Sequence, residues 1–166
     1  MPLPACQTGA MPSVWGMTPR QSIEAECARR GKSQVVSGCV ALLQGREVDD
    51  ALVLALGGPP AEYVLRGGAG GRDGYWPRAW GCRGLLYVWE DEAMPAVIEA
   101  TKDSAWRVRE MAAKVIARHR VADAIGAVVG LQDDPVARVR AAGERAVIAL
   151  YHPNAHQGAI PSANGR

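Results

Sequence analysis

Phenylalanine is absent from the sequence, and aromatic residues of all kinds make up only 5% of its 166 positions. No alternating strand pattern with hairpin turns stands out either. Alanine, valine and leucine are abundant, and such small apolar side chains suit closely packed helices better than a sandwich of strands. These features argue against an all-β domain and favour an all-α one.

Residues that bind metals are few and scattered. The cysteines are Cys6, Cys27, Cys39 and Cys82, and the histidines are His119, His152 and His156. The cysteines have no C-x-x-C or zinc-like spacing, and Pro153 interrupts the helical spacing of the last two histidines. We therefore expect no metal and no cofactor. The last three cysteines lie among apolar neighbours, which indicates buried, reduced thiols in a cytoplasmic protein.

The two ends of the chain differ in composition from its middle. Residues 1–17 are broken by proline and glycine and lack the basic start and apolar stretch of a signal peptide, so a disordered leader is predicted. Residues 152–166 are polar and similarly broken, which predicts a disordered tail. One folded domain is expected at 18–151, long enough to bury a core. No apolar run approaches the length of a membrane span, so a membrane is not an expected partner.

Capping signals predict a succession of helices. Thr18, Pro19 and Gln21 form a capping-box pattern, and Gly31 is typical of a helix end. Ser33 is expected to cap the next helix. The predicted helices cover 19–30, 33–45, 51–56, 61–66, 76–89, 91–101, 104–119, 122–131 and 135–150.

The strongest pattern is a segment that occurs twice. Asp103–Arg109 recurs 31 residues later as Asp134–Arg140, with aspartate, arginine, valine and arginine matching in place. A weaker copy, Asp73–Trp76, lies 30 residues before the first. A fixed period of roughly 20–50 residues is typical of a solenoid in which one helix pair stacks on the next. Each long second helix is expected to follow a shorter first helix.

The repeated segment resembles HEAT repeats, specifically the short bacterial kind first noticed in phycobilisome lyases. Their mark is Asp-Asp-Pro between two helices, with the second beginning x-x-Val-Arg-x-x-Ala-Ala; 131–142 matches closely and 101–113 matches well. The resemblance is specific over 91–150, looser over 48–90 and poor over 18–45. It implies an all-α fold, a right-handed α-α superhelix of about three helix pairs with an N-terminal helical hairpin.

Residue spacing agrees with this fold. One face of the helix at 104–119 carries Val108, Met111, Ala112, Val115, Ile116 and His119. Asp103 and Asp134 stand where an N-cap carboxylate satisfies free backbone N–H groups. Arg109 and Arg140 are expected to pair with these two aspartates. His119 falls near a helix C-terminus, where a positive charge is favourable.

Two glycine-containing segments look superficially like phosphate-binding loops. Gly31-Lys32-Ser33 matches the end of a P-loop, but Glu26 stands where the motif needs its first glycine, and the context is helical. Residues 67–74 are rich in glycine, but Asp73 stands where the dinucleotide fingerprint needs its third glycine. The first segment is interpreted as a helix end and the second as a flexible connector.

Basic residues at equivalent positions of the two repeats suggest a binding surface. Arg107 corresponds to Arg138 and Lys114 to Arg145, so stacking would build a two-by-two basic patch on the concave side of the solenoid. The predicted binding residues are Trp76, Arg78, Arg83, Trp106, Arg107, Lys114, Arg138 and Arg145. The alternative is a solvated helix face, partly neutralised by glutamates such as Glu110.

Aromatic residues gather in the same region. Tyr75, Trp76, Trp80, Trp89 and Trp106 fall within 32 positions, and the two tryptophans spaced i, i+4 share a helix face. They are interpreted either as buried packing at repeat junctions or as an exposed surface that grips a ligand or nucleobase.

Three functions are compatible with these patterns. The favoured one is a non-enzymatic interaction module that binds a protein partner, because no nucleophile–base pair or metal set is present. The alternative is a nucleic-acid-binding protein resembling the HEAT-like alkylpurine DNA glycosylases. Ala105–Arg109 is similar to one of their helix starts, but their Trp-Trp-Asp-x-x-Asp segment is absent and Trp89-Glu90-Asp91 is the nearest analogue. The third, a bilin-lyase role, is implied only by the family in which such repeats were named, and no cysteine or acidic pair here supports it.

The charge of the chain does not decide between these functions. A net charge of +2 is too mild to indicate nucleic-acid binding by itself. The oligomeric state stays open.

Overall fold

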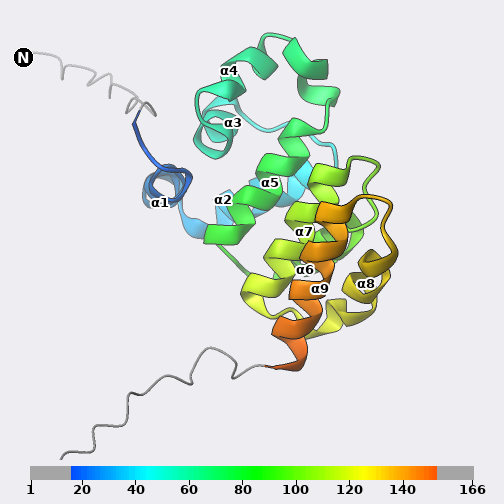
Figure 1. Ribbon diagram of the computed structural model, residues 1–166. Helices are drawn as coiled ribbons and strands as arrows, with labels where there is room; N and C mark the ends of the chain where they lie inside the picture. Colours follow the sequence, from blue (N-terminus) through cyan, green and yellow to red (C-terminus); the bar gives the residue numbers. More distant parts are fainter. Residues whose placement is uncertain (1–15, 153–166) are drawn as a thin grey trace, which may run out of the picture.

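The computed structural model describes residues 16–152, which fold into helices and turns without strands (Figure 1). The helices are α1 (Pro19–Arg30), α2 (Lys32–Leu43), α3 (Asp50–Gly57), α4 (Pro60–Leu65), α5 (Trp76–Tyr87), α6 (Met94–Ala100), α7 (Trp106–His119), α8 (Ile125–Gly130) and α9 (Ala137–Tyr151). Short 3₁₀ turns are η1 (Gly68–Asp73), η2 (Asp91–Ala93), η3 (Ala122–Ala124) and η4 (Leu131–Asp133). Nearly all of the predicted leader and tail, with Cys6 and His156, lies outside the described residues. Within 16–152, no helix is both long and apolar enough to cross a membrane.

The start of α1 confirms the predicted capping box. The Thr18 hydroxyl accepts the backbone N–H of Gln21, and the Gln21 side chain accepts the Thr18 N–H at 2.9 Å. Gly31 ends the helix with φ at 95°, a left-handed conformation that glycine adopts without strain. The prediction for Ser33 was wrong: α2 begins directly after Gly31 without a side-chain cap, and the Ser33 hydroxyl donates to Glu90 at 2.9 Å.

The helices form two layers. α5, α7 and α9 lie side by side in one layer, and α6 and α8 pack behind α7 and α9 (Figure 1). The main partner of α5 is α2 rather than the helices that directly precede it. α3 lies beside α5 and also contacts α1. The two C-terminal pairs therefore follow the chain order, whereas the pair around α5 is made by a helix from farther back in the sequence.

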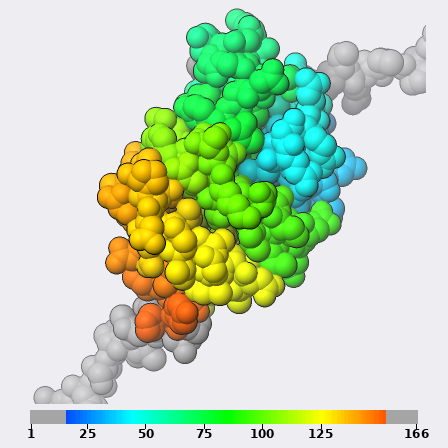
Figure 2. All heavy atoms as spheres, turned by 90° about the vertical axis from the view of Figure 1, so that its right-hand side faces the viewer, coloured from blue at the N-terminus to red at the C-terminus, as the bar shows by residue number. Residues whose placement is uncertain are grey.

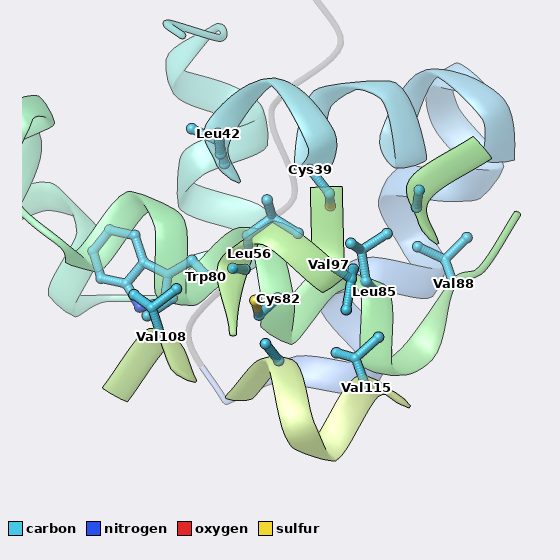
Figure 3. Packing of buried hydrophobic residues seen from close by; sticks show 14 of the residues in the cluster. Cys39, Leu42, Leu56, Trp80, Cys82, Leu85, Val88, Val97, Val108 and Val115 are labelled. Carbon is cyan, nitrogen blue, oxygen red and sulfur yellow. The ribbon is translucent and has the colours of Figure 1, made fainter. Parts of the chain in front are cut away.

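A continuous hydrophobic core runs between the layers. In Figure 3, Cys39 and Leu42 of α2 converge with Leu85 of α5, Val97 of α6 and Val115 of α7. All five side chains are almost fully buried. Burying a valine or leucine side chain contributes about 1.5–3 kcal/mol, so this core is the main source of stability. On α7 the predicted apolar face is confirmed, because Val108, Ala112, Val115 and Ile116 are fully buried.

The glycine-rich segment at 67–74 is more ordered than a simple connector. It folds into the turns of η1 and packs on α4 at one end of the molecule, the upper end in Figure 2. Arg72 anchors it by donating to the Val48 carbonyl at 3.1 Å and by pairing with Asp50. Asp50 follows Asp49, whose carboxylate caps α3 by accepting the N–H of Leu52 at 3.0 Å. Arg72 thus ties the end of the α3–η1 insert to the start of α3.

Candidate functional site: the face of α5, α7 and α9

The two repeated aspartates organise the turns that precede α7 and α9. Asp103 accepts the N–H of Ala105, and Asp134 accepts the N–H of Val136, both at 2.8 Å. Ala105 and Val136 are themselves the N-cap residues of their helices. The carboxylates therefore bind the N-cap N–H groups and not those of the first helical turn, which differs from the predicted capping role.

Arginines connect each repeat to the next. Arg109 donates to both carboxylate oxygens of Asp134, at 2.7 and 3.0 Å, and to the Asp103 carbonyl at 2.8 Å. Arg78 binds the Asp103 carboxylate in the same way, at 2.6 and 3.1 Å. Arg140 repeats the carbonyl contact alone, to Asp134 at 2.7 Å. The predicted pairing with these aspartates is therefore made by Arg109, which reaches into the next repeat, whereas Arg140 contacts only backbone carbonyls among the described residues. Arg78 belongs to this ladder and not to the predicted binding patch.

Most of the predicted binding residues surround one small hollow. Six of them line a hollow of about 180 Å³ between α5, α7 and α9: Trp76, Arg83, Trp106, Arg107, Lys114 and Arg138. Arg145 lines a neighbouring depression with Arg118 and Ile148, and Lys114 lies between the two because it lines both. Stacking of the repeats thus brings these six residues, which are up to 62 positions apart in the sequence, to one hollow.

Guanidinium groups and aromatic rings alternate along this hollow. The guanidinium carbon of Arg107 lies 5.6 Å from the ring centre of Trp76 and 4.4 Å from that of Trp106. Arg138 lies over Trp106 from the next helix, at 5.5 Å. Tyr75 contacts both Trp76, at 4.9 Å between ring centres, and Arg107, at 5.8 Å. We call these five residues the Arg–Trp face. Each such contact is worth about 0.5–1 kcal/mol at an exposed site, so the rings hold both guanidinium groups in place.

One buried carboxylate balances part of the positive charge. Glu110 of α7 is only 6% exposed and binds Lys114 at 2.9 Å and Arg138 at 3.3 Å. Burial alone would raise the pKa of Glu110, but its two cationic neighbours outweigh burial and lower it. Glu110 therefore neutralises part of the charge of both Lys114 and Arg138, as the alternative of a partly neutralised helix face predicts. Arg107 pairs with no carboxylate among the described residues and stays exposed.

The aromatic residues combine the two predicted roles. Trp80 is 2% exposed and stacks on Trp76 at 5.9 Å, as their i, i+4 spacing predicts. Trp89 stacks on His119 at 4.8 Å and donates to Asp91 at 3.0 Å. Trp80 is thus core packing, whereas Trp76 and Trp106 have one part in the core and one part on the surface.

His119 is half-buried at the end of the apolar face of α7, in the last turn of the helix, as its position in the sequence predicts. Its Nε2 lies 2.7 Å from the Leu85 carbonyl, and its ring is covered by Trp89. Burial lowers the pKa of His119, the Leu85 carbonyl opposes this, and the nearby positive charge of Arg118 adds to the lowering. The neutral ring, donating to Leu85, is therefore the stable form in the folded protein.

We expect the free energy of unfolding to fall as the pH drops below about 6.5, the ordinary pKa of histidine. In this range His119 becomes protonated in the unfolded chain but stays neutral in the folded protein, where its pKa is lower, so acid favours unfolding. The test is chemical denaturation between neutral and mildly acidic pH, for the wild type and His119→Gln. A smaller decline in the variant is the expected result, and parallel pH profiles would contradict this role for His119.

The described cysteines behave as packing residues. Cys39 and Cys82 are fully buried, and Cys27 is partly exposed; none forms a disulfide within 16–152. Burial raises the pKa of Cys39 to about 12, which leaves its thiol protonated and unreactive at neutral pH. Over the same range, no three side chains of the types that bind metals cluster together.

The stacked helix pairs and the inter-repeat ladder define an α-helical repeat protein with a solenoid fold. Residues 74–148 match the family model described as HEAT repeats, and this part of the chain belongs to that family. The match begins just before α5 and ends within α9, so it covers the helices that carry the Arg–Trp face. No curated protein and no solved structure matches the chain.

Proposed function

We propose that this protein is a non-enzymatic interaction module that binds an acidic segment of a protein partner through the Arg–Trp face. HEAT repeats usually mediate interactions. The observation that carries the proposal is the alternation of Arg107 and Arg138 with aromatic rings across α5, α7 and α9. A guanidinium group that lies over a ring still has N–H groups that can donate to a carboxylate, and arginine and tryptophan are enriched at the energetic centres of interfaces.

A protein partner is favoured over nucleic acid because the tryptophan rings of the face are already in contact with other side chains. Non-specific binding of single strands relies on aromatic faces on which bases can stack. Trp106 already carries Arg107 and Arg138 over its ring, and Trp76 is covered by Arg107 and Trp80. The face therefore offers guanidinium edges and no open ring face, which suits carboxylate side chains better than stacked bases.

Charge reversal at the face tests this function. We expect Arg107→Glu with Arg138→Glu to weaken partner binding at least about tenfold, because both guanidinium edges are replaced by carboxylates. The matched control is Lys102→Glu with Arg118→Glu, two exposed residues outside the hollow. Each pair of substitutions exchanges two positive charges for two negative ones, so it takes the net charge from +2 to −2. Helix content should be unchanged in both variants.

Binding is measured in two ways. Fluorescence anisotropy of a labelled peptide of alternating glutamate and leucine reports affinity for an acidic segment, and affinity capture from a native lysate reports the natural partner. Binding by the control and loss by the face variant support the proposal. Equal binding by both variants would contradict it. Tight, steeply salt-dependent binding of labelled DNA or RNA that only the face variant loses would favour the nucleic-acid alternative.

A further inference from the structure

A second, larger cavity adjoins the Arg–Trp face. It has a volume of about 520 Å³ and lies between α1, α3, α4 and α5. Its walls include Leu56, Pro59, Tyr63, Trp76 and Trp80, which make them mainly apolar and aromatic. Binding sites for small molecules typically measure about 300–1,000 Å³ and combine such walls with a few polar groups. Size and lining therefore both fit a small organic ligand.

Arg83 supplies the charged group in this cavity. It lies on α5, lines the cavity and is partly buried. Its one hydrogen bond within 16–152 runs from Nη1 to the Leu56 carbonyl at 3.3 Å, although a guanidinium group has five N–H donors. The other N–H groups are not sealed off, because every fully enclosed side-chain nitrogen or oxygen in the described region has a partner. Arg83 can therefore donate to a molecule in the cavity.

The missing carboxylate sets Arg83 apart. The partly buried arginines of the described residues are Arg30, Arg72, Arg78, Arg83 and Arg109. All except Arg83 form ion pairs with aspartates of the chain. All 17 aspartates and glutamates of the sequence lie within 16–152, so residues 1–15 and 153–166 contain no acidic side chain that could serve.

Leaving the Arg83 charge alone is unfavourable. Burial lowers the pKa of Arg83, since desolvation disfavours the charged form. An arginine nevertheless stays protonated at neutral pH, so the positive charge remains beside apolar walls. An anion from outside the chain would complete the arrangement that the other partly buried arginines already have, with a charge-assisted hydrogen bond.

We propose that the cavity binds a small apolar monocarboxylate, with the carboxylate held by Arg83 and the apolar body packed against Trp76 and Trp80. This inference goes beyond the proposed partner binding and does not depend on it. Trp76, Trp80 and Arg83 line both the cavity and the hollow at the Arg–Trp face, so the two sites are adjacent.

Calorimetric titration of the full chain with naphthylacetate and with its neutral analogue naphthylacetamide tests the charge requirement. We expect the acid to bind about tenfold more tightly than the amide, since a hydrogen bond between charged groups is stronger than a neutral one. Arg83→Gln should abolish this preference, and Arg83→Lys should retain part of it. The control is Arg118→Gln, an exposed arginine outside the cavity. Equal binding of acid and amide, or unchanged binding by Arg83→Gln, would overturn the proposal.

Two-dimensional N–H NMR spectra of the wild type locate the ligand without any substitution at Arg83. The indole signals of Trp76 and Trp80 should shift with added naphthylacetate, while Trp89, which lines neither the cavity nor the hollow, should not. Shifts confined to Trp106 would place the ligand on the Arg–Trp face instead and overturn the assignment. The proposal would also be overturned if naphthylacetate did not bind at millimolar concentration. If Arg83→Gln fails to fold, these wild-type spectra and the comparison of acid with amide still test the proposal.

Discussion

Asp134→Asn should lower the free energy of unfolding by about 2–4 kcal/mol, because removing one partner of a buried ion pair leaves the other charge uncompensated. Asp134 is 8% exposed and binds Arg109 through both carboxylate oxygens. Asparagine has nearly the same shape and can still accept the N–H of Val136, so the substitution isolates the contact between repeats. Urea denaturation followed by circular dichroism measures the effect.

The matched control is Glu24→Gln, which breaks the exposed pair with Arg20 within α1. Exposed pairs contribute about 0–1 kcal/mol, so this variant should be nearly as stable as the wild type. A similar small loss in both variants would mean that the ladder does not hold the repeats together. Arg109 also lowers the pKa of Asp134. The stabilisation should therefore be complete above the ordinary aspartate pKa of about 3.9 and disappear as the pH falls through the lower folded value.

The solenoid fold could be predicted from the sequence because its signals are local. The Asp103 and Asp134 repeats, the apolar face of α7 and the capping box at Thr18 each lie within one helix and its preceding turn. What the sequence did not reveal depends on how distant elements meet. The pairing of α2 with α5 spans the whole α3–η1 insert, and no pattern of spacing indicates it. The pairing of Arg109 with Asp134 of the next repeat likewise could not be predicted, because it depends on how the two repeats are aligned when they stack.

The candidate site was predictable only in part, for the same reason. Equivalent positions in two repeats identified Arg107 and Arg138, and the structure places both on one hollow. Arg78 and Arg83 were grouped with them from position alone. Arg78 pairs with Asp103 instead, whereas Arg83 lines both this hollow and a cavity built by helices from the N-terminal half. No sequence motif indicates that cavity, because its walls are mainly apolar residues of the kind found in any helical core.

The close contact between α2 and α5 gives the second large expected effect. Gly81→Ala should lower the free energy of unfolding by about 1–3 kcal/mol, the usual range for overpacking a core. A Cβ at Gly81 would lie 2.8 Å from the carbonyl oxygen of Cys39 and 3.3 Å from the Cβ of Leu42. The oxygen belongs to the backbone of α2, so it cannot rotate away as a flexible side chain would. The two helices would have to separate along the core seen in Figure 3.

The sign of this effect is opposite to the intrinsic preference of the residue, which makes a matched control informative. Alanine is favoured over glycine inside a helix by about 0.8–1.0 kcal/mol, so helix propensity alone would make Gly81→Ala stabilising. Gly126 of α8 is exposed, and a Cβ there would meet nothing within 4 Å. Gly126→Ala should therefore raise stability slightly, and thermal unfolding of the two variants should move in opposite directions. A rise in both would mean that α2 and α5 do not approach as closely as the structure shows.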